Sequence, residues 1–241
     1  MLAMDPEANH GRNSPLRDLL KHPVDVVVEA LDKLGITADQ ITVTGLLGNI
    51  LATSIVARDN LKPREDRLPW FTSTLILLLP KILDLLDGSL ARKQGTNNPN
   101  LDAASDRISE TIAGLAIMGS NSKARLSALA STLTAPLPSL SRAWAESQGK
   151  VVPESAIGSY PVRVMTTTTA LVFPKIATPV LSAQSLASTI TTIERIDCKT
   201  DIKLDPESAN KSHDRLKLLV GLTALSVIAG LGLNSYLNKS K

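Results

Sequence analysis

Hydrophobic residues in this chain are gathered into long blocks rather than into short runs that alternate with polar residues. The blocks contain few charged side chains and cover residues 41–57, 70–86, 103–120, 124–145, 162–178, 179–193 and 216–237. Blocks of roughly 20 residues are typical of helices that cross a membrane. We therefore predict an all-α polytopic membrane bundle, with six core transmembrane helices and a candidate seventh transmembrane helix at residues 216–237.

Residues 16–34 have a different pattern, in which apolar side chains such as Val26 and Leu31 are mixed with charged side chains such as Asp25 and Lys33. This mixture predicts an amphipathic helix that lies along the membrane interface. The chain is then expected to have three parts: a polar and interfacial N-terminal segment (1–40), a membrane domain (41–196), and a polar linker with a C-terminal apolar helix (197–241).

Composition limits the alternatives without deciding among all of them. The mean hydropathy is only +0.08, and several blocks are rich in Ser, Thr, Ala and Gly. Small residues allow close helix packing in lipid, but they also suit a soluble helical bundle, which stays an alternative. The chain has only two Trp, two Tyr and two Phe, so aromatic platforms that bind single-stranded nucleic acid are not expected. A pI near 9.0 fits a surface that faces anionic lipid.

Lys and Arg are unevenly divided between the two sides of the predicted bundle. If the blocks cross the membrane alternately, more of these residues lie on the side that holds the N-terminus and the loop after residue 86. Cytoplasmic loops carry this excess in membrane proteins. We therefore predict an integral protein of the cell membrane whose loop after residue 86 faces the cytoplasm.

Four aspartates stand at the end of one apolar block and the start of a later one. Asp84 and Asp87 are three residues apart, and Asp102 and Asp106 are four apart, so each pair shares one face of a helix. Carboxylate oxygens are the ligands that Mg²⁺ and Mn²⁺ prefer, and two such ions can polarise a phosphoryl group. The spacing predicts a divalent metal site where the two faces meet.

This part of the chain resembles the CDP-alcohol phosphotransferase signature. The D-x-x-D-G-x-x-A-R half of the signature is matched by Asp84, Asp87, Gly88, Ala91 and Arg92, and its D-x-x-x-D end by Asp102 and Asp106. Asn98 stands where the pattern has a glycine, and the loop between Arg92 and Asp102 is shorter than the pattern usually allows.

The resemblance implies a helical membrane enzyme, commonly a homodimer, that transfers a phosphatidyl group from CDP-diacylglycerol to an alcohol and releases CMP. In such an enzyme the four aspartates would hold two Mg²⁺ or Mn²⁺ ions, and Asp106 would be the general base. Gly88, Ala91 and Arg92 would bind the CDP part of the donor. A non-catalytic membrane protein that retains a cation site is the alternative, because of Asn98 and the short loop.

A second segment, residues 139–149, is similar to the S-Y-x-K/R-A-R-A-E-x-x-G segment of the phosphatidylinositol-phosphate synthase branch. Arg142 occupies a basic position of the segment, whereas Trp144 replaces its second arginine. The similarity implies that Arg142, together with Arg163, binds a phosphorylated polyol, with inositol phosphate favoured and glycerol 3-phosphate next. Arg142 could instead form a helix-surface ion pair with Glu146, and Arg163 could be a membrane-surface anchor.

Overall fold

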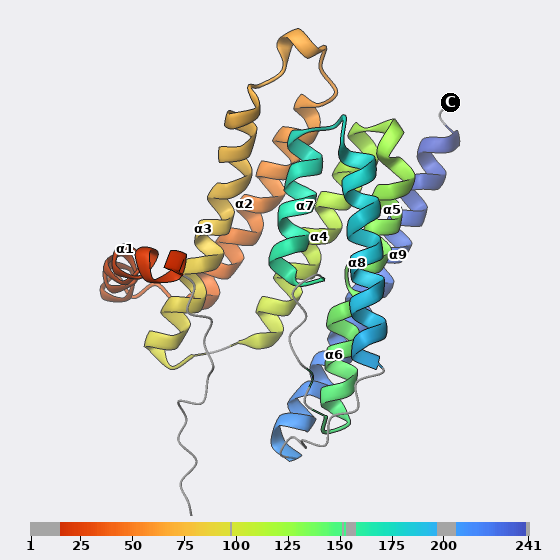
Figure 1. Ribbon diagram of the computed structural model, residues 1–241. Coiled ribbons are helices and arrows are strands. Elements are labelled where there is room, and N and C mark those ends of the chain that lie inside the picture. The colour runs from red at the N-terminus through yellow and green to blue at the C-terminus, as the bar shows by residue number, and fades with distance from the viewer. Residues whose placement is uncertain (1–14, 97, 151, 153–157, 197–205, 240–241) are drawn as a thin grey trace, which may run out of the picture.

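The computed structural model describes residues 15–96, 98–150, 152, 158–196 and 206–239, and this part of the chain is all helical (Figure 1). The all-α prediction is therefore confirmed. The α-helices are α1 (Pro15–Lys33), α2 (Ala38–Asp59), α3 (Trp70–Gln94), α4 (Pro99–Ser120), α5 (Arg125–Thr134), α6 (Leu137–Ser147), α7 (Tyr160–Val172), α8 (Ala177–Ile196) and α9 (Pro206–Lys239). Two short 3₁₀ turns, Arg64–Asp66 and Ser122–Ala124, lie before α3 and α5.

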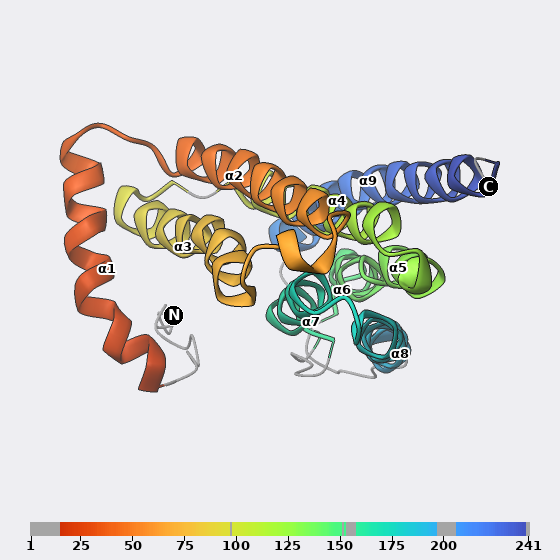
Figure 2. The ribbon, with the colours of Figure 1, turned by 90° about the horizontal axis from the view of Figure 1, so that it is seen from above.

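Helix α1 lies across the other helices, beside the C-terminal half of α3 (Figures 1 and 2). Its apolar face buries Val28 against Leu86 and Leu90 of α3. The Gln94 side chain at the end of α3 donates hydrogen bonds to the Asp32 carboxylate (3.1 Å) and the Ile36 carbonyl (2.9 Å). The bond from Gln94 lowers the pKa of the Asp32 carboxyl below its ordinary value. The helix predicted for residues 16–34 is therefore present as α1, and its location along a membrane interface stays a prediction.

The block at residues 124–145 forms two helices, so its prediction as one continuous span was wrong. The break between α5 and α6 lies at Ala135 and Pro136, because proline has no N–H with which to continue the helical ladder. Buried arginines bond carbonyls near the break: Arg107 donates to Ala135 (3.3 Å), and Arg195 donates to Pro138. The boundary between the next two predicted spans also differs. It was predicted at residue 178, whereas α7 ends at Val172 and α8 begins at Ala177.

Among the described helices, two are long and apolar enough to cross a membrane by length and composition: α2, and residues 216–237 within α9. The other predicted spans do not pass this test. Their polar residues nevertheless face inward, as Ser131, Ser188 and Thr191 are almost fully buried. The outer face of α2, in contrast, exposes the large apolar side chains Val43, Leu47, Leu51 and Ile55.

The bundle core consists largely of small side chains. A cluster that includes Ala52, Ala113, Ala128 and Ala177 joins helices α2, α4, α5 and α8. Gly114 lies so close to Thr132 that a Cβ atom at position 114 would collide with the threonine side chain. This close approach fixes α4, which carries two of the predicted site residues, against α5.

Candidate metal centre and active site

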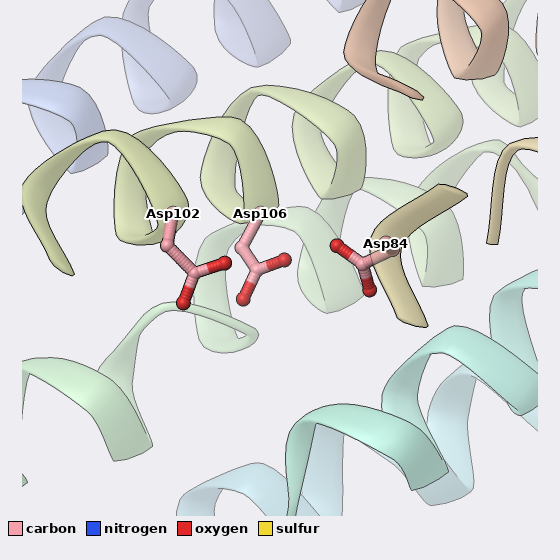
Figure 3. Close-up of side chains that lie close together, drawn as sticks. All are labelled: Asp84, Asp102 and Asp106. Carbon is pink, nitrogen blue, oxygen red and sulfur yellow. The ribbon is translucent and has the colours of Figure 1, made fainter. Parts of the chain in front are cut away.

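Three of the four predicted aspartates converge. Asp84 comes from α3, whereas Asp102 and Asp106 come from α4, and Asp106 lies between the other two (Figure 3). One carboxylate oxygen from each residue lies within 4.8 Å of the others. Carboxylate oxygens are hard ligands of the kind that Mg²⁺ and Mn²⁺ prefer. A small movement of the three side chains toward one another would bring these oxygens to one ion. The cluster lies in the half of the bundle next to α1.

The two helices that supply these carboxylates leave space between them. Over the described residues, α3 and α4 both pack against α2 but not against each other. Helix α3 ends at Gly95, whose φ of 63° is in the left-handed region that favours glycine. Asn98 then caps α4, accepting a hydrogen bond from the Leu101 N–H (3.3 Å) and donating one to Asp39 (3.3 Å). Asn98 thus has a defined role at the start of the helix that carries Asp102 and Asp106.

Asp87 lies apart from the three converging carboxylates. Its Oδ2 accepts a hydrogen bond from the Thr42 hydroxyl on α2 (2.6 Å), and the side chain is buried. Asp87 still lines the same cavity as the other three aspartates. The structure therefore brings all four to one cavity, but only Asp84, Asp102 and Asp106 to within reach of a shared ion.

This aspartate cavity has a volume of about 270 Å³. Its lining consists of Ala38, Asp39, Thr42, Asp84, Asp87, Gly88, Ala91, Asn98, Asp102, Asp106 and Tyr160. Five of these described lining residues are aspartates, and none is Lys or Arg. Carboxylates that share a site repel one another unless cations or protons compensate them. The charge of the cavity and its oxygen donors therefore fit divalent cations.

Two of the three residues predicted to bind CDP line the aspartate cavity. Gly88 and Ala91 contribute small surfaces to its wall. Arg92 is exposed near the C-terminal end of α3, where its guanidinium donates to the Ser89 hydroxyl (2.9 Å). Arg92 is not part of the cavity lining in this conformation.

A second cavity, of about 260 Å³, shares Asp102 and Asp106 with the first. We call it the arginine cavity, and its lining is Pro99, Asp102, Ala103, Asp106, Arg107, Ser139, Arg142, Ala143, Glu146 and Leu219. Nε of Arg142 lies 2.7 Å from Oε1 of Glu146, so the predicted helix-surface ion pair is present. The same arginine faces the cavity, which means that the ion pair and a binding role are compatible.

Arg163 is not in the arginine cavity. Its side chain is only 3% exposed and donates to Glu110 (2.8 Å) and to the Gly158 carbonyl (2.5 Å). The interpretation of Arg163 as a membrane-surface anchor is therefore wrong. In this conformation Arg163 joins α7 to α4 and to the segment before α7.

The profile of the CDP-alcohol phosphatidyltransferase family matches residues 35–194, which is more than half of the chain. The chain belongs to this family. The match begins just before α2, covers the aspartates, and ends within α8.

Family members of known name and structure agree with this assignment. The chain is 32% identical over 111 residues to the archaetidylinositol phosphate synthase of Pyrococcus horikoshii, an alignment that covers 44% of this chain and 54% of that protein. It thus spans about half the length of this curated relative. The fold is similar to that of the phosphatidylinositol phosphate synthase of Mycobacterium tuberculosis with CDP-DAG bound, with a TM-score of 0.57, 18% identity, and coverage of 72% of this chain and 91% of that chain. The same enzyme in complex with manganese and citrate also gives a TM-score of 0.57 at 18% identity, with coverage of 72% and 87%.

Helix α9 lies outside the residues that match the CDP-alcohol phosphatidyltransferase family. It packs against α4, α5 and α6 (Figure 1). The hydroxyls of Thr111 on α4 and Ser226 on α9 are 2.6 Å apart and share a hydrogen bond. Leu219 of α9 is buried and lines the arginine cavity. The helix therefore adds a wall to the cavity beside the family's aspartates.

Three charged or polar residues at or beside these cavities were not predicted from the sequence. Arg107 lines the arginine cavity, Tyr160 lines the aspartate cavity, and Glu110 lines neither but pairs with Arg107. Arg107 and Arg163 both pair with Glu110, and all three side chains are largely buried. Charges inside an apolar block are costly and usually functional, so Arg107 and Glu110 carried a signal that could have found them. Tyr160 had no such signal in the sequence, because only the fold brings α7 beside the aspartates.

Proposed function

We propose that this family member transfers a phosphatidyl group from CDP-diacylglycerol to a phosphorylated polyol and releases CMP. The observation that carries the proposal is the position of Asp102 and Asp106, which line both the aspartate cavity and the arginine cavity. A donor pyrophosphate held with cations in the first cavity would meet an anionic acceptor held in the second. The named relatives, a phosphatidylinositol phosphate synthase and an archaetidylinositol phosphate synthase, support the same reaction class.

The donor would bind in the aspartate cavity. Asp84, Asp102 and Asp106 would hold one Mg²⁺ or Mn²⁺ ion, and Asp87 would help to hold a second after turning from Thr42. Bound ions of this kind neutralise charge on a transferring phosphoryl group and its leaving group. Gly88 and Ala91 leave room for the nucleotide, and Arg92 would reach a phosphate by changing its rotamer.

Asp106 is the proposed general base because it lies at the junction of the two cavities. Its carboxylate would accept the proton of the acceptor hydroxyl as that oxygen attacks the β-phosphorus. The new bond joins the acceptor oxygen to the β-phosphorus, and the bond from this phosphorus to the bridging oxygen breaks, so that CMP leaves. A positioned base of this kind typically contributes about 10²- to 10⁴-fold to a rate.

The acceptor would bind in the arginine cavity, where Arg142 and Arg107 supply positive charge. The side chain of Arg142 is 43% exposed, so its guanidinium can bind a phosphate while Glu146 holds its Nε. Inositol phosphate is the favoured acceptor, and glycerol 3-phosphate is the second candidate. Arg163 would act only indirectly, through Glu110 and Arg107.

The outward-facing apolar side chains support a location in the cell membrane. Helices α2, α3, α4, α7 and α8 would each cross the membrane once, and the short helices α5 and α6 would together make the remaining crossing of the six-span unit. Helix α9 would be a seventh span. Helix α1 would lie in the interface at the level of the aspartates, with the site facing the cytoplasm.

The test of this proposal is CMP release by the purified protein in mixed micelles. The CDP-activated lipid, CDP-diacylglycerol, would be supplied together with Mn²⁺ or Mg²⁺. Four acceptors would be compared: inositol phosphate, glycerol 3-phosphate, free inositol and glycerol. We expect CMP release with inositol phosphate and a rate of release at least about tenfold lower with free inositol. Free inositol has no phosphate to form a charge-assisted hydrogen bond with Arg142. If no acceptor supports CMP release, the transferase proposal fails.

Replacing Arg142 by glutamine should raise the KM for the phosphorylated acceptor about 10- to 100-fold, because a charge-assisted hydrogen bond to phosphate is lost. The KM for the CDP-activated lipid should stay nearly constant, since Arg142 is outside the aspartate cavity. The matched control is Arg64→Gln, because Arg64 is exposed in the 3₁₀ turn between α2 and α3 and is distant from Arg142 in the sequence. Equal acceptor KM values in the two variants would contradict the assignment of the arginine cavity.

A further inference from the structure

Tyr160, the first residue of α7, reaches the aspartates from a part of the chain that the signature does not include. Its side chain lines the aspartate cavity. Asp106 lines the same cavity, and the Tyr160 hydroxyl lies near enough to the Asp106 carboxylate for the two groups to interact. Two cations lie near the ring, with Lys81 Nζ 5.6 Å and the Arg163 guanidinium carbon 5.9 Å from its centroid. These contacts restrain the tyrosine from several sides.

Lys81 sets the direction of the hydrogen bond that Tyr160 makes. Nζ of Lys81 lies 3.3 Å from the Tyr160 hydroxyl oxygen. An ammonium group only donates, so the tyrosine oxygen accepts from Lys81 and its own proton is free to point elsewhere. An ionised carboxylate only accepts, so that proton is directed at Asp106. With one rotation of the Tyr160 hydroxyl, the three residues can form an ordered chain of donors that runs from Lys81 through Tyr160 to Asp106.

The position of Lys81 within α3 strengthens this interpretation. A lysine within an apolar segment is costly in lipid and is retained mostly where it has a partner and a function. Lys81 is one turn before Asp84 and close enough for electrostatic attraction to that carboxylate. Its ammonium thus compensates part of the negative charge at the edge of the cavity while it binds the tyrosine.

We propose that Tyr160 is a positioning residue for Asp106 and that Lys81 acts through Tyr160. This inference rests on the proposed function. The hydroxyl of Tyr160 bonds to the Asp106 carboxylate and stops it from rotating, so that its lone pairs stay directed at the cation and at the acceptor hydroxyl. Residues that orient a metal ligand in this way typically affect metal affinity or activity about 10- to 100-fold when they are removed.

The test uses Tyr160→Phe, Lys81→Met and the double variant in the full-length protein. Phenylalanine removes only the hydroxyl, so we expect kcat for CMP release to fall about 10- to 100-fold, with the KM for the CDP-activated lipid within about twofold of wild type. Mn²⁺ affinity, measured by electron paramagnetic resonance without substrate, should weaken in the same variant. Tyr236 is 70% exposed on α9 and supplies the matched control Tyr236→Phe.

The double variant separates positioning from a general structural effect. If Lys81 acts through the hydroxyl, Lys81→Met should lower kcat in the wild type but have almost no further effect once Tyr160 is phenylalanine. Lys81→Arg, which keeps a donor, should restore part of the loss. Thermal unfolding of each variant in detergent should stay within a few degrees of wild type.

The inference would be overturned if Tyr160→Phe changed neither kcat nor Mn²⁺ affinity, or if the two substitutions had independent effects. It would also be overturned if the losses followed the unfolding temperature. Failure of the proposed function looks different, because the wild-type protein would then release no CMP with any acceptor. In that case the Mn²⁺ titration of Tyr160→Phe still decides whether the hydroxyl positions Asp106.

Discussion

Replacing Asp106 by asparagine should lower the rate of CMP release by about 10³-fold or more, measured at saturating concentrations of CDP-activated lipid and acceptor. The substitution keeps the shape of the side chain but removes the negative charge and the ability to accept a proton. Loss of a general base alone typically costs about 10²- to 10⁴-fold, and a weakened cation site adds to the loss. An amide oxygen can still accept a hydrogen bond from the nearby Tyr160 hydroxyl, so the fold should be preserved.

The control for this measurement is Asp66→Asn, because Asp66 is an exposed carboxylate in the 3₁₀ turn between α2 and α3. Its rate should equal that of the wild type. An Asp106→Asn rate within threefold of wild type would contradict the role of Asp106 as base. An equal loss in both variants would show that the assay reports on folding and not on the site.

Replacing Leu51 by lysine should prevent stable integration of the protein into the membrane fraction. Leu51 lies near the middle of α2 and is 64% exposed on the outer face of the bundle. A lysine at the centre of a membrane-spanning helix costs about 2.5 to 3.5 kcal/mol on insertion scales. We therefore expect much less protein in carbonate-washed membranes than for the wild type. In a soluble bundle the same surface substitution would have almost no effect.

The loop between α2 and α3 offers a matched control. The exposed fraction of Leu61, 66%, is almost the same as that of Leu51, but Leu61 lies just beyond the end of α2. Leu61→Lys should leave the amount of protein in the membrane unchanged. If Leu51→Lys and Leu61→Lys behave alike and the wild type is recovered in the supernatant without detergent, the soluble alternative is correct.

The sequence was sufficient to predict which helices carry the site, because that part depends on local spacing. Asp84 and Asp87 share a face of one helix, as do Asp102 and Asp106, and three of the four carboxylates do converge. The orientation of Asp87 could not be predicted, since it depends on Thr42 of a neighbouring helix. The same limit applies to Tyr160, which reaches Asp106 only because of the way α7 packs.

Helix boundaries were predictable where an apolar block ended at charges, as for α2, which ends two residues after the predicted position 57. Helix α3 continues beyond its predicted end at residue 86 to Gln94, just before Gly95. Boundaries were not predictable where buried side chains stabilise an interruption. The break near Pro136 is tolerated because Arg107, far away in sequence, donates to the Ala135 carbonyl. The modest mean hydropathy has a related cause: Ser and Thr residues such as Ser188 and Thr191 are buried between helices while apolar residues face outward.

The arginines show most clearly how burial changes an interpretation. Arg142 and Arg163 were both predicted to bind the acceptor, from one resemblance. Arg142 lines the arginine cavity, but Arg163 is enclosed by Glu110 and Gly158. The resemblance treated the two arginines alike, and only the packing of α7 against α4 distinguishes an arginine that lines a cavity from one that is enclosed between helices.

If carboxylates from α3 and α4 jointly hold a divalent cation, as we propose, the purified protein should bind Mn²⁺ through them. Electron paramagnetic resonance would follow free Mn²⁺ during titration of the wild-type protein, Asp84→Asn, Asp102→Asn and the control Asp66→Asn. We expect saturable binding by wild type and control, and an affinity at least about tenfold weaker in each of the two site variants. Equal Mn²⁺ affinity in all four proteins, or free Mn²⁺ throughout the wild-type titration, would contradict this proposal.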